Sequence, residues 1–313
     1  MRAIITGGTG LIGSQLARLL GQEGNDVVIL SRNPSRYAGQ MPAGARLMQW
    51  DARTPDGWAH LLDEEDTFII NLAGHNPANW RWTEAHKQRV LDSRIAVTEA
   101  VVKAIQDATH KPHALIQASA VGYYGNTGEH AINEHAPPTH DWRAQVCVHW
   151  EARAAQSGVR TVMLRIGIVL DQHGGAFPPF MAATDLFGSR LGDGTQWIPW
   201  VHNDDVATTI RFLMHHREAE GPYNITAPEP VRNHEFMDTL AHVRGRPSWI
   251  PVPAFALRAV IGEQADVVLD SQRILPQKLL EAGYKFRYPD VESALRDILS
   301  RPKHWESKHH DAK

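Results

Sequence analysis

The sequence predicts an α/β fold: a Rossmann-like, doubly wound parallel sheet with a small, mainly C-terminal substrate-side lobe. Two observations carry this prediction. A glycine turn of the pattern G-x-x-G-x-x-G, at residues 7–13, lies between a short apolar run and a stretch with leucines at helical spacing. Continuous apolar runs then alternate with helical patterns as far as residue 170, which is typical of parallel strands covered on both faces. In such folds the ligand binds at the carboxyl ends of the strands.

The glycine turn follows the apolar run Ala3-Ile4-Ile5, which we expect to be the first buried strand. Glycines let a turn close and let the backbone approach a pyrophosphate, whose charge meets free N–H groups at the N-terminus of the next helix. The alternative is an ordinary tight turn, but the flanking strand and helix patterns favour the nucleotide site. The residues assigned to the cofactor here are Gly7, Thr9, Gly10, Leu11, Ile12 and Gly13.

The second predicted strand, 26–30, ends at Ser31 and Arg32. An acidic residue usually stands near this point in NAD-preferring folds, where it holds the ribose 2′-hydroxyl, and none is present. Arg32, with Ser31 beside it, instead offers a donor fork for a 2′-phosphate, which predicts NADP as the cofactor. The alternative is that Arg32 only ends the strand.

The third and fourth predicted strands also end in candidate cofactor contacts. Residues 46–50 close on Asp51, which either reaches the adenine or caps the turn. Residues 68–74 run into a loop of small side chains that would let the backbone lie against the cofactor. The loop residues assigned to the cofactor are Leu72, Ala73 and Gly74.

The second half of the sheet is predicted from two further strands and two helices. A helical stretch from Trp80 to Lys103 precedes a fifth strand at 114–119, which ends at Ser119. A polar loop at 126–143 precedes a helix at about 144–156, and residues 161–170 form a sixth strand, apolar almost throughout. Ser119 and Arg165 complete the residues assigned to the cofactor.

The sequence pattern changes after residue 170, where frequent glycines indicate a loop-rich section. We expect helices at 204–214, from Asn233 as a cap, around 257–269 and at 291–299, and a strand at 222–225. The predicted domains are 1–170, an NADP-binding Rossmann domain to which 201–221 returns, and a substrate-side lobe of 171–200 and 222–300. Residues 301–313 form a polar tail. Trp197, Trp200 and His202 are dense beside the glycine-rich loop, which predicts that they line the substrate cleft.

The composition excludes several classes of protein. Of 313 residues, 42% are hydrophobic and 21% charged, values typical of a globular chain with a sizeable core. The net charge of −3 predicts no nucleic-acid partner and no anionic membrane. No apolar run approaches the ~18 residues of a membrane span, and the N-terminal strand leaves no secretory signal. The single cysteine, Cys147, suits a reducing cytoplasm. The 18 histidines are scattered without a ligand motif, so no metal site is predicted.

The order of several short motifs resembles the extended short-chain dehydrogenase/reductase superfamily. Within it, the chain is most similar to the atypical "epimerase family protein" branch of the YfcH type, over about residues 1–300. The resemblance implies an NADP-binding Rossmann domain, a small C-terminal lobe and a small-molecule substrate; a homodimer is left open. The motifs are the glycine turn, Asn71-Leu72-Ala73-Gly74, Arg81-Trp82-Thr83, Ser93-Arg94, Ser119-Ala120-Val121-Gly122-Tyr123-Tyr124-Gly125, Cys147-x-x-Trp150-Glu151 and Trp200-Val201-His202-x-x-Asp205.

The chain departs from the wider superfamily at its catalytic pair. Ordinary members carry Tyr-x-x-x-Lys on the helix after the fifth strand, where the tyrosine transfers the proton that accompanies hydride transfer. Here Cys147 and Glu151 stand at that spacing, on one helix face. A neighbouring carboxylate raises the pKa of a thiol, so Cys147 is a poor thiolate unless a cation such as Arg165 intervenes. The alternative for Cys147 is a small buried residue.

Oxygen acids are therefore the predicted proton donors: Tyr124, then Glu151 and Glu134, with Ser119 as a hydrogen-bond donor to a substrate oxygen. Each has a structural alternative, since Glu151 would pair with an arginine and Tyr124 would tighten its loop. The predicted function is an NADP(H)-binding oxidoreductase or epimerase acting on a small carbonyl or sugar-like substrate. The alternatives are a catalytically silent NADP(H) sensor and a protein-interaction scaffold.

Overall fold

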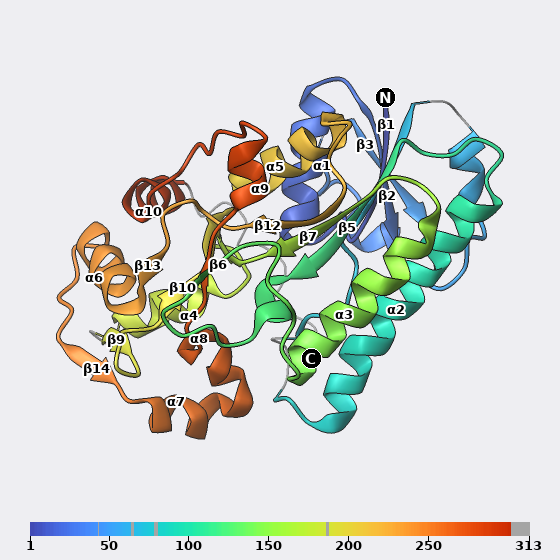
Figure 1. Cartoon of the computed structure of the whole chain (residues 1–313). Helices are drawn as coiled ribbons and strands as arrows, with labels where there is room; N and C mark the ends of the chain where they lie inside the picture. Colours follow the sequence, from blue (N-terminus) through green and yellow to red (C-terminus); the bar gives the residue numbers. More distant parts are fainter. Residues whose placement is uncertain (43, 64–65, 78–80, 186–187, 302–313) are drawn as a thin grey trace.

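A central parallel sheet organises the computed structural model, which describes residues 1–42, 44–63, 66–77, 81–185 and 188–301 (Figure 1). Every neighbouring pair in this sheet is parallel, and β1 lies between β4 and β2. Within the described ranges its seven strands, in spatial order, are β12 (Gly221–Ile225), β7 (Thr161–Ile166), β5 (Ala114–Ala120), β4 (Thr67–Asn71), β1 (Arg2–Thr6), β2 (Asp26–Ser31) and β3 (Ala45–Gln49).

Helices cover both faces of the sheet, as Figure 1 shows for α2 and α3 on one side and α1 and α5 on the other. The helices are α1 (Leu11–Gln22), α2 (Glu84–Asp107), α3 (Trp142–Ala154), α4 (Phe177–Asp185), α5 (Asn203–His215), α6 (Asn233–Val243), α7 (Ala254–Ile261), α8 (Asp266–Leu269), α9 (Gln277–Glu281) and α10 (Val291–Ser300). Short 3₁₀ turns are η1 (Pro34–Tyr37), η2 (Ala59–Asp63), η4 (Val121–Tyr124), η5 (Ala155–Ser157) and η6 (Gly262–Ala265).

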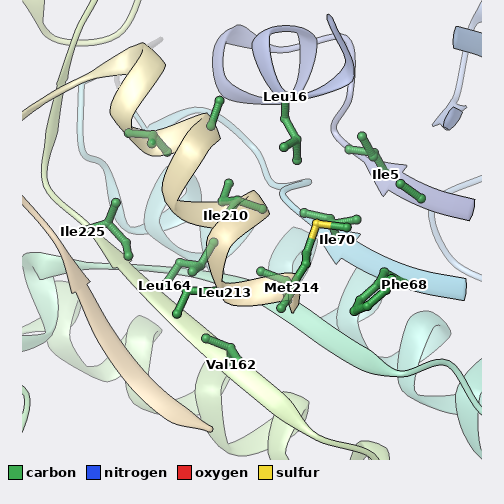
Figure 2. Close-up of a cluster of buried hydrophobic side chains, with 14 of the residues drawn as sticks. Ile5, Leu16, Phe68, Ile70, Val162, Leu164, Ile210, Leu213, Met214 and Ile225 are labelled. Carbon is green, nitrogen blue, oxygen red and sulfur yellow. The ribbon is translucent and has the colours of Figure 1, made fainter. Parts of the chain in front are cut away.

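The strands are buried on both faces because their apolar residues follow one another without polar alternation. Successive side chains point to opposite sides of a strand, so Ile5 packs in the cluster under α1 and α5 while Ile4 packs in the cluster under α2. Figure 2 shows Leu16 of α1 and Ile210 of α5 directed at the strand residues of the first cluster. Fully burying each such side chain contributes about 1.5–3 kcal/mol. The predicted doubly wound sheet is confirmed.

The predicted sixth strand, 161–170, is wrong in one respect, because it is divided at Gly167. Residues before Gly167 form β7 in the central sheet, whereas β8 (Ile168–Leu170) leaves it and pairs with β11 (Trp200–His202). A Cβ on Gly167 would lie 2.1 Å from the carbonyl oxygen of Pro199, so only glycine fits at the crossing. The apolar pattern continues through the break because both strands are buried.

Three further boundaries differ from the predictions. The long helix begins at Glu84 with Thr83 as its cap, and the predicted start at Trp80 lies outside the described residues. Helix α3 begins at Trp142, because Asp141 caps it ahead of the predicted start at residue 144. Asn233 is the first residue of α6 rather than its cap, and its side-chain oxygen accepts a hydrogen bond from the backbone N–H of Leu191.

The C-terminal lobe has its own core, in which α4, α6 and α10 pack together. Strand β12, assigned from the sequence to this lobe, pairs instead with β7 of the central sheet. The remaining strand pairs are β9 (Gly188–Leu191) with β14 (Ile250–Val252), β10 (Trp197–Ile198) with β13 (Val231–Arg232), and β6 (Ala131–Ile132) with β15 (Arg273–Ile274). Of the predicted tail, 302–313 lie outside the described residues. None of the described helices has both the length and the hydropathy to cross a bilayer.

Candidate cofactor and substrate site

A cavity of about 510 Å³ opens at the carboxyl ends of β1, β4, β5 and β7. Its lining includes the glycine turn and Leu72 and also three tryptophans, Trp82, Trp142 and Trp150, which we call its aromatic end. Of the residues predicted to hold the cofactor, six line the cavity: Gly7, Gly10, Leu11, Ile12, Gly13 and Leu72. Its position is the one that a doubly wound fold predicts for a ligand.

The glycine turn is a close-packed cradle. A Cβ on Gly13 would lie 2.5 Å from the carbonyl oxygen of Gly7, and a Cβ on Gly7, whose φ is +68°, would lie 2.8 Å from the backbone of Leu72. Gly10 is the N-cap of α1 and offers no side chain to the first helical N–H groups. Free N–H groups at a helix N-terminus and a backbone that a ligand can approach fit the pyrophosphate of a dinucleotide. Thr9 lies on this turn and is partly exposed.

The end of β2 carries the residues predicted to select the cofactor. Ser31 is buried and its hydroxyl accepts a hydrogen bond from the N–H of Asn33. Arg32 is exposed, and its guanidinium makes no hydrogen bond or ion pair with the part of the chain that the structure describes. Its backbone carbonyl accepts a hydrogen bond from Gln49. The arginine is therefore free to contact a bound anion.

Asp51 follows β3 and caps its own turn. Its carboxylate accepts hydrogen bonds from the N–H groups of Arg53 and Thr54, and the bond from Thr54 is the main reason that the pKa of Asp51 is lowered. Beyond β4, the N–H of Ala73 donates to the Thr6 hydroxyl, which ties the end of β4 to β1. Gly74 lies against the side chain of Arg94.

Glu151, which is partly buried, forms an ion pair with the buried Arg165. The Arg165 Nε donates to Oε1 at 2.9 Å and Nη2 donates to Oε2 at 2.8 Å, while the Ser119 hydroxyl donates to Oε1 at 2.6 Å. The alternative interpretation of Glu151, pairing with an arginine, is what the structure shows. Arg165 also stacks on the ring of Tyr123, with its Cζ 3.5 Å from the ring centroid.

Tyr124 and Glu134 extend this network away from the cavity. The Tyr124 hydroxyl accepts a hydrogen bond from Arg165 Nη1 at 2.8 Å and donates to Asn224 Oδ1 at 2.7 Å. Burial raises the pKa of Tyr124 to about 12. The Glu134 carboxylate accepts a hydrogen bond from the backbone N–H of Asn224 on β12. Tyr124, Glu134, Glu151, Ser119 and Arg165 are all absent from the cavity lining.

Cys147 is the predicted catalytic residue that does line the cavity. Its thiol is buried and donates to the carbonyl oxygen of Ala120 at 3.6 Å. Burial and, second, the charge of Glu151 raise the pKa of Cys147 to about 11. The predicted direction of this shift agrees with the geometry, and the thiol is protonated at neutral pH.

The three residues predicted to form the substrate cleft have other surroundings and do not line this cavity. Trp200 is fully buried in the C-terminal core and donates to the carbonyl oxygen of Glu229. Trp197 donates to Glu129 and carries the guanidinium of Arg232 on its ring. His202 is buried and stacks on Tyr288 with ring centroids 4.0 Å apart.

His202, Asp204 and Asp297 form the one group of possible metal ligands found among the described residues. The Nδ1 of His202 accepts the N–H of Asp204 at 3.0 Å, so Nε2 carries the proton and donates to Asp297 at 3.1 Å. Neither ring nitrogen retains a lone pair for a metal. Arg301 also pairs with both aspartates. The group is a capping and packing cluster.

Sequence reasoning missed the aromatic end of the cavity. Trp82 and Trp142 meet edge to face with centroids 4.7 Å apart, and the Trp150 indole N–H donates to the Thr98 hydroxyl. Arg94 and Arg143 line the same end. Trp82, Arg94 and Trp150 stand in the motifs that carried the family resemblance, but nothing in their spacing predicts that they converge.

Comparison with known proteins places the chain among named families. Residues 3–226 match the model of the "NAD dependent epimerase/dehydratase family", and residues 252–298 match "Domain of unknown function (DUF1731)". The chloroplastic "Epimerase family protein SDR39U1 homolog" of Arabidopsis thaliana is 37% identical and covers 96% of this chain and 87% of its own length. "Epimerase family protein YfhF" of Bacillus subtilis (strain 168) is also 37% identical, over 96% and 98% of the two chains.

Solved structures agree with these matches. The crystal structure of human epimerase family protein SDR39U1 with NADPH is 31% identical, covers 95% of this chain and 99% of its own, and superposes with a TM-score of 0.84. The UDP-glucose 4-epimerase of Thermus thermophilus, in complex with NAD, has a TM-score of 0.72 over 95% and 98% of the chains. At 20% identity the second likeness concerns the fold alone.

Proposed function

The chain belongs to the NAD dependent epimerase/dehydratase family, and from this premise we propose that it is an NADPH-dependent oxidoreductase acting on a small carbonyl compound. The observation that carries the proposal is the continuous cavity, which joins the glycine turn to a wall of three tryptophans. One end fits a dinucleotide and the other fits a small apolar molecule.

The proposed preference for NADPH over NADH rests on the end of β2. Arg32 is exposed beside Ser31, and residues 31–33 include no carboxylate that could hold a ribose 2′-hydroxyl or repel a 2′-phosphate. The human relative is described with NADPH, whereas more distant structures of the same fold are described with NAD. Bound NADPH would supply a hydride for a carbonyl carbon.

The proton that accompanies hydride transfer needs a donor at the cavity wall. The sequence-based order places Tyr124 first, but the hydroxyl of Tyr124 is engaged by Arg165 and Asn224 outside the lining. We therefore place Cys147 first, because its thiol lines the cavity and remains protonated near pH 7. Because the thiol carries its proton near pH 7, it is in the state that can give a proton to a developing alkoxide and not in the state that can remove one from an alcohol, so this assignment favours carbonyl reduction over alcohol oxidation.

A catalytically silent NADPH sensor is the second candidate. The favouring observation is that the described cavity lining contains no aspartate, glutamate or tyrosine. The two functions differ in turnover: an oxidoreductase consumes NADPH when a carbonyl library is supplied, and a sensor binds NADPH without consuming it. Loss of NADPH consumption in Cys147→Ala, with nucleotide affinity retained, supports the enzyme.

Cofactor preference is the first test. We expect calorimetry to show tighter binding of NADPH than of NADH, because an arginine–phosphate contact contributes about 1.5–3 kcal/mol, or roughly 10- to 150-fold in affinity. Arg32→Ala should lose this preference by weakening NADPH while leaving NADH unchanged. Arg36→Ala, an exposed arginine on η1, is the matched control. Equal affinity of the native protein for the two nucleotides would contradict the proposal.

A further inference from the structure

Arg94 of α2 lies in the wall of the cavity at its aromatic end. Its Cζ is 4.9 Å from the ring centroid of Trp150, and its charge acts on the neighbouring Cys147. A Cβ at Gly74 would lie 3.2 Å from Arg94 Cγ, so the loop after β4 packs tightly on the arginine side chain. The guanidinium is therefore held in the cavity wall near Cys147.

The hydrogen bonds of Arg94 leave one edge of its guanidinium unused. Nη1 donates to the carbonyl oxygens of His75 and Val90, both at 3.0 Å. Nε and Nη2, which share the opposite edge, make no hydrogen bond with the described residues, and no carboxylate among them pairs with Arg94. An Nε/Nη2 edge is the fork that binds both oxygens of a carboxylate.

The second arginine of the cavity wall has a different environment. Arg143 forms an ion pair with Asp270 and a longer one with Asp141. Its charge is balanced by carboxylates, whereas among the described residues Arg94 has only two backbone carbonyl oxygens and the ring of Trp150 as partners. A buried cation without a counter-ion is costly, and burial lowers the pKa of Arg94. Such a group indicates a site for an anion.

We propose that the Nε/Nη2 edge of Arg94 binds an acidic group of the substrate. The substrate is then a small carbonyl compound that carries a carboxylate and whose apolar or aromatic body lies among Trp82, Trp142 and Trp150. This inference rests on the proposed function and narrows its substrate class. Among the described residues, the side chains of the lining that carry polar groups other than an indole or the thiol are those of Asn76, Arg94, Arg143 and Gln272. Such a wall suits an apolar acid better than a molecule rich in hydroxyl groups.

Binding of 2-naphthoate and of uncharged 2-naphthamide, measured by calorimetry with and without saturating NADP⁺, tests the proposal. We expect the native protein to bind the naphthoate at least about 10-fold more tightly than the amide, as an arginine–carboxylate contact predicts. Arg94→Gln should remove this difference. Arg94→Lys should retain only part of it, because a lysine lacks the planar fork. Arg89→Gln, at an exposed position of the same helix, removes the same charge and should change neither affinity.

The same titrations separate the two sources of an anion. Loss of NADPH affinity in Arg94→Gln with unchanged naphthoate binding would overturn the proposal and assign the guanidinium to a cofactor phosphate. Equal binding of naphthoate and naphthamide by the native protein would also overturn it. If the native protein bound no NADPH, the proposed function would fail, while the comparison without nucleotide would still decide the role of Arg94. Thermal unfolding of each variant shows whether it folds.

Discussion

Cys147 faces the cavity from α3 with Glu151 one helical turn behind it. Its thiol is buried, donates to a backbone carbonyl, and has a carboxylate rather than an ammonium group as its helical neighbour. These conditions stabilise the thiol over the thiolate. Arg165, the cation named from the sequence as a possible counterweight, is committed to Glu151. Cys147 is thus a protonated thiol and a weak nucleophile at neutral pH.

The pH dependence of alkylation tests this description. The pKa of Cys147 is raised to about 11, so at pH 8 only about one thiol in a thousand is ionised, compared with roughly a quarter for an ordinary cysteine. We expect the iodoacetamide rate of the folded protein to keep rising tenfold per pH unit through pH 9.5. Since Cys147 is the single cysteine, mass spectrometry reads this site alone.

The urea-unfolded protein is the control and should show an inflection near the usual thiol pKa of about 8.5. Saturating NADPH should slow the reaction of the folded protein, because the thiol lines the proposed binding cavity. A rate for the folded protein that levels off below pH 9 would show that the thiolate is stabilised and would contradict the environment described.

The direction of the pKa shift of Cys147 is predictable from the sequence, but the hydrogen-bond partners of the residues around it are not. The spacing of Cys147 and Glu151 places both on one helix face and fixes the direction of the thiol pKa shift. Tyr124 looks equally suited to proton transfer until its partner Asn224 is known, and that residue lies 100 positions away. Likewise, no motif indicates that His75 and Val90 accept from Nη1 of Arg94 while its Nε/Nη2 edge makes no hydrogen bond with the described residues.

Gly167 divides what the sequence presents as a single strand. Its N–H donates to the carbonyl oxygen of Ile225, and the next N–H, of Ile168, donates to that of Pro199. The chain thereby leaves the central sheet and continues as β8, which pairs with β11. Side chains of both strands pack in the core of the C-terminal lobe. Apolar periodicity cannot reveal this change of sheet, because β7 and β8 are equally buried. A glycine within an apolar strand is the one local signal of a close backbone approach.

Gly167→Ala should destabilise the fold by at least about 1–3 kcal/mol, the usual cost of overpacking. The new Cβ would lie 2.1 Å from the Pro199 oxygen, so one of the two backbones must move. Urea unfolding followed by tryptophan fluorescence measures the change. Gly122→Ala is the matched control, because its Cβ would meet only the Arg143 Cβ at an ordinary 3.4 Å. Equal stability of the two variants would show that the crossing tolerates a side chain.

At the scale of the whole molecule, the central sheet and the C-terminal core are linked where β11, α5 and α10 meet. His202 ends β11, caps α5 through Nδ1, stacks on Tyr288 and donates to Asp297 of α10. The central sheet and the C-terminal core are thus linked through one buried ring. The sequence indicates the helix start at this position, from Asp205 in its first turn, but not the partners from α10, which follow some ninety residues later. The cleft role expected for His202 came from local density of aromatic residues, which does not distinguish a cavity wall from a core.

We expect low pH to destabilise the folded protein through His202. Burial holds the pKa of His202 below its usual 6.5, outweighing the opposing effect of Asp204 and Asp297, while Arg301 acts in the same direction as burial. The unfolded chain therefore takes up a proton near pH 6.5 that the folded chain refuses, so the stability due to the neutral ring is complete above pH 6.5 and is lost as the pH falls below it. The loss is at most about 1.4 kcal/mol per pH unit from this one group.

We expect urea unfolding to show a larger loss of unfolding free energy between pH 7.5 and 5.5 for the native protein than for His202→Asn, whose amide oxygen can still cap α5 but does not titrate. The variant starts less stable at pH 7.5, having lost the stacking on Tyr288, and its curve against pH should be flatter. If both proteins lost the same free energy over this range, His202 would titrate with the same pKa in the folded and unfolded chain, and the lowered pKa of the buried ring would be contradicted.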